Sequence, residues 1–192
     1  MSGLVIRELT PTALDDFLAF FDHEAFTDNP DWADCYCMFY QFTGTGKEWA
    51  ESKAAQNRHQ VSNLTSEGKM RGLLAYENGK MVAWCNAAPR SNYPALARVL
   101  KLPANDSDQV GSIVCFVVAP THRRKRIASR LLEAACKSFA HTGLEFAEAY
   151  PRRDSSSSAD NFPGPLSMYL KAGFSPIRET ESYVVVRKKL TE

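Results

Sequence analysis

The stretch from Val117 to Leu132 constrains the fold of this chain more than any other part of its sequence. An apolar run leads through Pro120 into a basic loop, and the loop continues into a segment with amphipathic helical spacing. Five of the eight residues from Arg123 to Arg130 are basic. Because the first N–H groups of a helix have no intrahelical partner and the helix dipole adds positive potential there, the stretch predicts an anion site between a strand and a helix.

Composition makes this basic cluster a local feature. The chain has 192 residues, of which 44% are hydrophobic, and its formal net charge is +1. That length suits one hydrophobic core, so we expect a single domain over residues 1–192. A chain with so little net charge has no field that would draw it to nucleic acid or to a membrane. We therefore expect the cluster to bind one small anion, with neither nucleic acid nor a membrane as a partner.

The cysteines and the first residues predict a cytoplasmic protein with reduced thiols. The five cysteines are an odd number, and the first ten residues lack the apolar core of a signal peptide. No apolar run approaches the roughly 18 residues that a membrane-spanning helix needs. Cys35 and Cys37 are closer together than zinc ligands usually are and no second pair accompanies them, so we expect no metal.

Hydrophobic spacing predicts one mixed α/β sheet with helices on both faces. The expected strands are residues 4–9, 71–76, 81–88, 111–118, 144–150, 174–177 and 183–190. The expected helices are residues 10–21, 47–64, 95–100, 127–142 and 165–172. Asn78-Gly79 between two apolar runs predicts a tight hairpin. The serine-rich segment 152–161 is expected to be a flexible surface loop within the domain.

One face of the helix after the basic loop is expected to enter the core, and Gly143 should end that helix. The residues of this face are Ile127, Leu131, Leu132, Ala135 and Phe139.

Two motifs in this frame resemble the GNAT superfamily of N-acetyltransferases. The basic loop is similar to the family's acyl-CoA pyrophosphate loop, Gln/Arg-x-x-Gly-x-Gly/Ala, and here reads Arg123-x-x-Arg126-x-Ala128. The run from Ser167 to Phe174 is similar to the family's Phe-Tyr-x-Lys-x-Gly-Phe ending, and the order of elements is the family's order. Shorter segments at 35–40, 87–90 and 148–151 resemble a bacterial subgroup. The resemblance implies a mostly antiparallel sheet of about seven strands, splayed between the fourth and fifth.

The resemblance also implies a binding site for acetyl-CoA as cosubstrate. Backbone N–H groups from Arg124 to Ser129 would hold the pyrophosphate, helped by the basic side chains. The implied cosubstrate-binding residues are Phe116, Val117, Val118, Arg123, Arg124, Lys125, Arg126, Ile127, Ala128 and Ser129. We expect Arg126 to replace the usual glycine at little cost, because the first turn of a helix has negative φ.

The implied reaction is direct attack of a primary amine on the thioester. In the resembling enzymes the pantetheine arm pairs with the free edge of the fourth strand, where the Val118 N–H is the candidate oxyanion donor. Tyr169 falls where the family places the acid that protonates the leaving thiolate; a core aromatic is the alternative. Glu148 is the candidate base, since an acid in an apolar strand is unusual unless it faces a cleft. The alternative for Glu148 is an exposed strand residue.

Other side chains have less specific interpretations. His122 is expected to be a loop residue, and Cys115 a buried thiol, because no histidine is placed to activate it. The aromatic span 32–40 and the turn 89–93 would either line the acceptor pocket or pack against the sheet.

Three alternative functions remain beside acetyl transfer. The acyl group could differ, or the chain could be a non-catalytic acyl-CoA-binding module that kept the clamp and lost the base. A nucleic-acid binder is disfavoured by the low net charge and by the lack of aromatic residues within the basic patch. The sequence leaves the acceptor and the oligomeric state open, a homodimer included.

Overall fold

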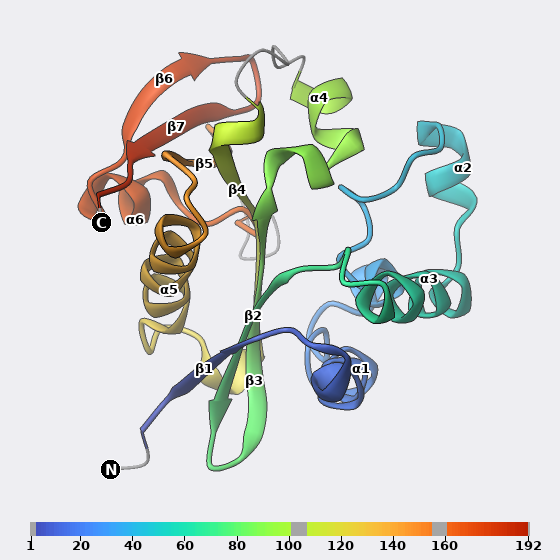
Figure 1. Ribbon diagram of the computed structural model, residues 1–192. Coiled ribbons are helices and arrows are strands. Elements are labelled where there is room, and N and C mark those ends of the chain that lie inside the picture. Colours follow the sequence, from blue (N-terminus) through green and yellow to red (C-terminus); the bar gives the residue numbers. More distant parts are fainter. Residues whose placement is uncertain (1–2, 101–106, 155–160, 192) are drawn as a thin grey trace.

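The computed structural model describes residues 3–100, 107–154 and 161–191. Their strands form a seven-stranded sheet in the order β1-β2-β3-β4-β5-β7-β6 (Figure 1). The strands are β1 (Val5–Glu8), β2 (Gly72–Glu77), β3 (Lys80–Pro89), β4 (Val110–Val118), β5 (Phe146–Ala149), β6 (Ser175–Glu179) and β7 (Val184–Lys189). Neighbouring strands are antiparallel except β4 and β5, which are parallel. The predicted mixed, mostly antiparallel sheet is confirmed.

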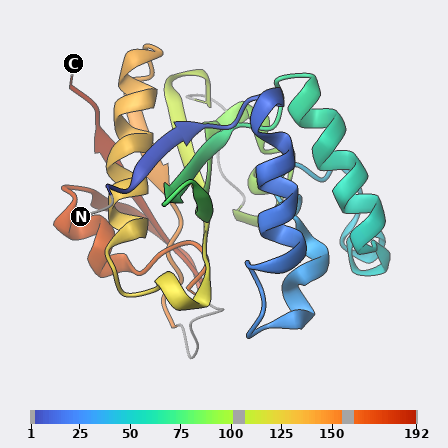
Figure 2. The ribbon, with the colours of Figure 1, turned by 90° about the horizontal axis from the view of Figure 1, so that it is seen from below.

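Helices cover both faces of this sheet, as predicted (Figures 1 and 2). On one face lie α1 (Leu14–His23), α2 (Gly46–Glu51), α3 (Ala54–Ser66) and α4 (Pro94–Leu100). On the other face lie α5 (Ile127–His141) and α6 (Leu166–Lys171). Each face has its own cluster of buried apolar side chains, centred on Trp84 and Phe17 in the first case and on Leu131 and Ile113 in the second.

Helix α5 follows its predicted pattern. Its buried residues are Ile127, Leu131, Leu132, Ala135 and Phe139, which is the face expected from the spacing. The helix ends at His141, and Gly143 adopts a φ of +81°, the left-handed conformation that closes many helices. Local periodicity was sufficient to predict the buried residues of α5 because the helix packs one continuous stripe of apolar side chains on the sheet.

The helix expected over residues 47–64 is wrong as one unit, because the chain leaves helical conformation at Ser52 and Lys53. Both residues are extended, and the Ser52 Oγ donates a hydrogen bond to the Trp49 carbonyl at 2.7 Å. A capping box between Thr45 and Glu48 starts α2 separately. The break turns α3 against the segment that precedes α2, where Asn57 donates to the Asp34 carbonyl at 2.8 Å.

The hairpin between β2 and β3 is confirmed. Asn78 and Gly79 have φ values of +53° and +78°, and Glu77 pairs with Lys80. Positive φ at both central residues is what a two-residue turn of this twist requires. The hairpin fixes the register of β3 and hence of β4.

The β4 edge is open toward β5 over half of its length. Strand β4 pairs with β3 from Gly111 to Val118, whereas β5 pairs only with Val110–Ile113. The pairing passes from Asn86–Cys115 to Ala87–Ile113, so β4 carries a bulge that bends it at this point. This is the predicted splay between the fourth and fifth strands.

Two further expectations concern the chain outside these elements. Of the predicted flexible segment 152–161, residues 155–160 lie outside the described residues. Among the described residues, no helix is long and apolar enough to cross a membrane.

Candidate functional site

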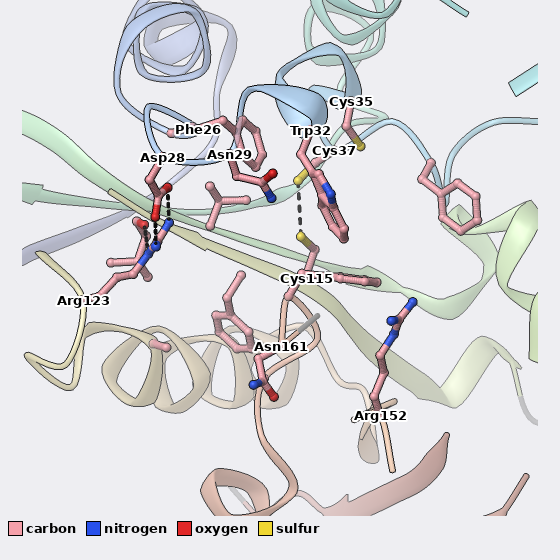
Figure 3. A pocket seen from close by; sticks show the side chains of 18 of the residues that line it. Phe26, Asp28, Asn29, Trp32, Cys35, Cys37, Cys115, Arg123, Arg152 and Asn161 are labelled. Carbon is pink, nitrogen blue, oxygen red and sulfur yellow. Dashed lines mark hydrogen bonds and ion pairs between the residues drawn. The ribbon is translucent and has the colours of Figure 1, made fainter. Parts of the chain in front are cut away.

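A cavity of about 1140 Å³ opens beside the free part of the β4 edge (Figure 3). Its floor is formed by Cys115, Phe116, Val117 and Val118 of β4. Its walls come from the loop before α5, from the segment between α1 and α2, and from residues 161–165 before α6. The cavity therefore joins the two sequence features predicted to bind one ligand, the strand edge and the basic loop.

Backbone N–H groups of β4 point from the floor toward this open edge. The Ala119 N–H donates to the Val82 carbonyl at 2.9 Å, on the β3 side. Because peptide directions alternate along a strand, the N–H groups of Val118 and Phe116 point the opposite way. The Phe116 N–H confirms this by donating to the Phe162 carbonyl at 2.6 Å. The edge therefore accepts an extended chain as a partner, and residue 162 already uses it in this way.

The first turn of α5 has N–H groups without intrahelical partners at the end of the floor. The first intrahelical hydrogen bond runs from the Arg130 N–H to the Arg126 carbonyl at 3.1 Å, and no side chain caps the helix. The N–H groups of Ile127, Ala128 and Ser129 thus lack intrahelical partners, and these three residues line the cavity. Unpaired N–H groups at a helix start suit a pyrophosphate.

The basic side chains of the loop do not all face the cavity. Arg123, Arg124 and Arg126 line it, whereas Lys125 is exposed and is not among the lining residues. Arg123 is held by Asp28, with an Nη2–Oδ1 distance of 3.0 Å, and its Nε donates to the Val118 carbonyl at 3.2 Å (Figure 3). The hydrogen bond from Arg123 lowers the pKa of Asp28. Arg123 therefore links the segment around residue 28 to the end of β4.

The expected backbone of Arg126 is wrong. Arg126 has a φ of +60° and precedes the helix as its N-cap, and Arg124 has a φ of +63°. The helix starts at Ile127, so Arg126 lies just before the first turn, and the glycine of the family's loop corresponds to a left-handed position. A residue with a Cβ pays about 1–2 kcal/mol for that conformation.

Comparing Arg126→Gly with Arg126→Ala should reveal this strain. Both changes remove the guanidinium, but only glycine relieves the strain of the left-handed backbone. The free energy of unfolding of the Gly variant should therefore be about 1 kcal/mol higher than that of the Ala variant. For a chain of this size that corresponds to roughly 2–4 °C in Tm by differential scanning calorimetry. An Ala variant at least as stable as the Gly variant would contradict the strained conformation.

Tyr169 lies behind the cavity wall. Its side chain is fully buried, stacks edge-on against Phe174 with ring centroids 5.3 Å apart, and donates its hydroxyl hydrogen to the Pro163 carbonyl. Burial raises the pKa of Tyr169 well above its ordinary value. A Cβ built on Gly164, which lines the cavity, would be 3.2 Å from the Tyr169 hydroxyl. One turn of backbone therefore separates this hydroxyl from the cavity, and its acid role stays a prediction.

Glu148 is neither exposed nor part of the cavity wall. Only 1% of it is accessible, and its Oε1 receives hydrogen bonds from Arg90 Nη1 at 2.7 Å and Arg187 Nη2 at 3.1 Å. Both guanidinium groups hold this carboxylate in the interior of the protein. The burial of Glu148 shows that the exposed-residue alternative is wrong, and its role as the base stays a prediction.

The wall opposite the basic loop is aromatic and acidic. The span 32–40 contributes Trp32, Phe39 and Tyr40 to the cavity lining, and Phe39 and Tyr40 also pack in the core on this face of the sheet. Asp31 and Asp34 are also lining residues. The turn 89–93 does not reach the cavity, since the Tyr93 hydroxyl is buried against Asn86 Oδ1 at 2.8 Å.

Sequence reasoning missed a group of residues that follows β5. Arg152, Asn161 and Phe162 line the cavity, with the Phe162 ring 5.4 Å from the ring of Trp32 (Figure 3). No periodic pattern marks them in the sequence. His122 also lines the rim, where its Nε2 lies 3.2 Å from a Glu77 oxygen. The described residues include no group of three or more potential ligands that could hold a metal ion.

These features define a class of protein. A parallel strand pair that splays open can bind an extended chain, and unpaired N–H groups at the next helix can bind the anionic end of that chain. The fold and the site are therefore those of an α/β protein that binds a long anionic cosubstrate of the acyl-CoA type.

Three solved structures share this fold along nearly the whole chain. An acetyltransferase of the GNAT family from Streptococcus pneumoniae has a TM-score of 0.56 at 15% identity, covering 98% of this chain and 100% of that one. The PaiA N-acetyltransferase of Thermoplasma acidophilum, in complex with coenzyme A, has a TM-score of 0.57 at 16% identity, covering 97% of this chain and 99% of that one. The ribosomal-protein-S18-alanine N-acetyltransferase of Escherichia coli has a TM-score of 0.54 at 13% identity, covering 99% of this chain and 96% of that one.

The sequence itself matches the family described as Acetyltransferase (GNAT) family over residues 13–174. The chain therefore belongs to the GNAT family, and it is a CoA-dependent N-acetyltransferase. No curated protein matches it.

Proposed function

We propose that this protein transfers an acetyl group from acetyl-CoA to a primary amine by direct attack of the amine on the thioester. The supporting observation is the single cavity that joins three surfaces. These surfaces are the open β4 edge, the unpaired N–H groups of α5 and an aromatic wall that carries carboxylates. The first two suit the cosubstrate and the third suits an amine.

The cosubstrate side of the proposal uses backbone groups first. The N–H groups of Ile127, Ala128 and Ser129 would bind the pyrophosphate, with Arg124 and Arg126 adding charge. The pantetheine amides would pair with the β4 edge as an added strand does, in place of the Phe162 carbonyl. On that edge the Val118 N–H would donate to the carbonyl oxygen, where negative charge develops in the transition state.

The acceptor side is proposed to be the wall that carries Asp31 and Asp34. A protonated amine is attracted to these carboxylates, while the rings of Trp32 and Phe39 can pack on its carbon skeleton. The ammonium group first loses one proton to solvent water. The free amine then forms the new C–N bond as the C–S bond breaks and CoA leaves as a thiolate, and the amide nitrogen loses its second proton to solvent.

Tyr169 is proposed to return a proton to that thiolate. Its raised pKa keeps the phenol protonated near neutral pH, and its hydroxyl lies directly behind Gly164. The transfer requires the hydroxyl to exchange the Pro163 carbonyl for the sulfur, which a small shift of the 163–164 turn would allow.

The direct test is release of free CoA thiol from acetyl-CoA with a panel of primary amines. The double variant Arg124→Gln with Arg126→Gln should raise the KM for acetyl-CoA by about 10–100-fold, because it removes two charged donors to phosphate. Lys125→Gln is the matched control, since Lys125 belongs to the same loop but does not line the cavity, and should change KM by less than about twofold.

Two outcomes would contradict the proposal. Equal effects of the double variant and Lys125→Gln would show that the loop acts only through its overall charge. CoA binding by calorimetry without thiol release for any amine would identify a binding module instead of an amine acetyltransferase.

A further inference from the structure

Two thiols meet on the floor of the cavity without any role in the proposed transfer. Cys37 and Cys115 are buried, both line the cavity, and their Sγ atoms are 3.5 Å apart (Figure 3). Cys115 belongs to the β4 floor and Cys37 to the wall between α1 and α2, and the two are 78 residues apart in the sequence. Both are free thiols.

The backbone that brings Cys37 to this position is strained. Tyr36 and Cys37 have φ values of +44° and +54°, two consecutive left-handed residues that both carry a Cβ. The Tyr36 hydroxyl donates to Asp22, which in turn binds Arg58 at 3.0 Å. A conformation this costly persists only where its surroundings enforce it, and such strain gathers at functional positions. The turn is therefore held so that the Cys37 thiol faces Cys115.

We propose that Cys37 and Cys115 form an oxidation site, which a peroxide entering the cavity converts to a disulfide that slows acyl transfer. In the first step peroxide oxidises one thiol to a sulfenic acid and is reduced to water. In the second step the other sulfur attacks the sulfenic sulfur, the S–S bond forms and a second water leaves. Two thiols and one hydrogen peroxide thus give one disulfide and two waters.

The geometry requires little movement for this reaction. A disulfide has an S–S length of about 2.05 Å, so the two sulfurs need to approach by roughly 1.5 Å. Burial raises the pKa of Cys37 well above its ordinary value, so little thiolate is present and the first step is slow at neutral pH. Cys35 lies on the same turn and also lines the cavity, so it is the natural competitor in any test.

The disulfide would act on the site through β4. Cys115 directly precedes Phe116, whose N–H points to the open edge, and Cys37 belongs to the wall opposite that edge. Drawing the two together shifts the floor relative to the acceptor wall, and a misplacement of about 1 Å near reacting groups can lower a rate by about 100-fold. The oxidised protein should therefore be slower, and also more stable, because the bond closes a long loop.

The test treats the full chain with a small excess of hydrogen peroxide, alkylates the remaining thiols and maps peptides without reduction. We expect one disulfide, between Cys37 and Cys115, and a rise in Tm of about 5–10 °C that dithiothreitol reverses. Thiol release from acetyl-CoA should fall at least about tenfold and recover with dithiothreitol. Cys35→Ser should still form the disulfide, whereas Cys37→Ser and Cys115→Ser should not show the rise in Tm.

Other results would overturn the inference. A disulfide that involves Cys35, or five alkylated thiols after peroxide treatment, would exclude the site. An oxidised protein with full activity would exclude its effect on transfer. Peptide mapping and Tm do not depend on catalysis, so failure of the proposed amine acetylation would leave this site testable.

Discussion

Phenylalanine in place of Tyr169 should lower the kcat of acetyl transfer by about 100-fold, which is a typical contribution of a general acid to the rate. The substitution keeps the ring that packs against Phe174 and removes only the hydroxyl. The Pro163 carbonyl loses its donor, so the free energy of unfolding should fall by about 1 kcal/mol. Steady-state kinetics with saturating acetyl-CoA and a denaturant titration measure the two effects separately.

Tyr183→Phe is the control for this variant. Tyr183 lines the cavity, as Tyr40 does, so its hydroxyl is a competing proton donor. If Tyr169 is the acid, Tyr183→Phe should keep kcat within about threefold of the unmodified protein. If Tyr169→Phe keeps its kcat within that range instead, the hydroxyl serves only to anchor the turn at 163–164.

Glutamine in place of Glu148 should lower the free energy of unfolding by about 3 kcal/mol. Glu148 and Arg90 are 1% and 7% exposed, and their charges compensate one another inside the protein together with Arg187. Breaking a buried ion pair from one side is costly because the remaining charge loses its partner in a low-dielectric environment. The Tm should fall by roughly 6–12 °C in calorimetry.

The control for Glu148→Gln is Glu145→Gln. Glu145 is exposed and accepts a hydrogen bond from Gln109 at 2.9 Å, so its loss should change stability by less than about 0.5 kcal/mol. A Glu148→Gln protein with unchanged stability and a kcat lowered by about 100-fold or more would support the role of base that the sequence suggested.

The elements that could be predicted are those governed by neighbouring residues. The core face of α5 follows from the spacing of Ile127, Leu131 and Phe139, and the hairpin follows from Asn78-Gly79. The open edge of β4 was expected from the resemblance, and the pairing with β5 does end at Ile113. The break at Ser52 was missed because the helical apolar spacing continues on both sides of it. That spacing gives no sign of the local hydrogen bond from Ser52 to the Trp49 carbonyl.

The site contains more that could not be predicted. The left-handed φ of Arg126 depends on how the loop must turn to place α5 on the sheet, which residue types alone do not reveal. The burial of Glu148 depends on Arg90, which is 58 residues away, and on Arg187, which is 39 residues away. The position of Tyr169 behind the wall depends on the turn at Pro163.

By itself the sequence determined the order of elements, the basic loop at the start of a helix and the family, because these depend on hydrophobic spacing and on groups adjacent along the chain. Only the tertiary structure decided which side chains face the cavity. It left Lys125 outside the cavity lining, enclosed Glu148 between two arginines and placed the Cys37 Sγ 3.5 Å from the Cys115 Sγ. Such contacts join segments that are distant in sequence. They form only when the sheet and its helices pack closely, because close packing restricts the conformation of each side chain.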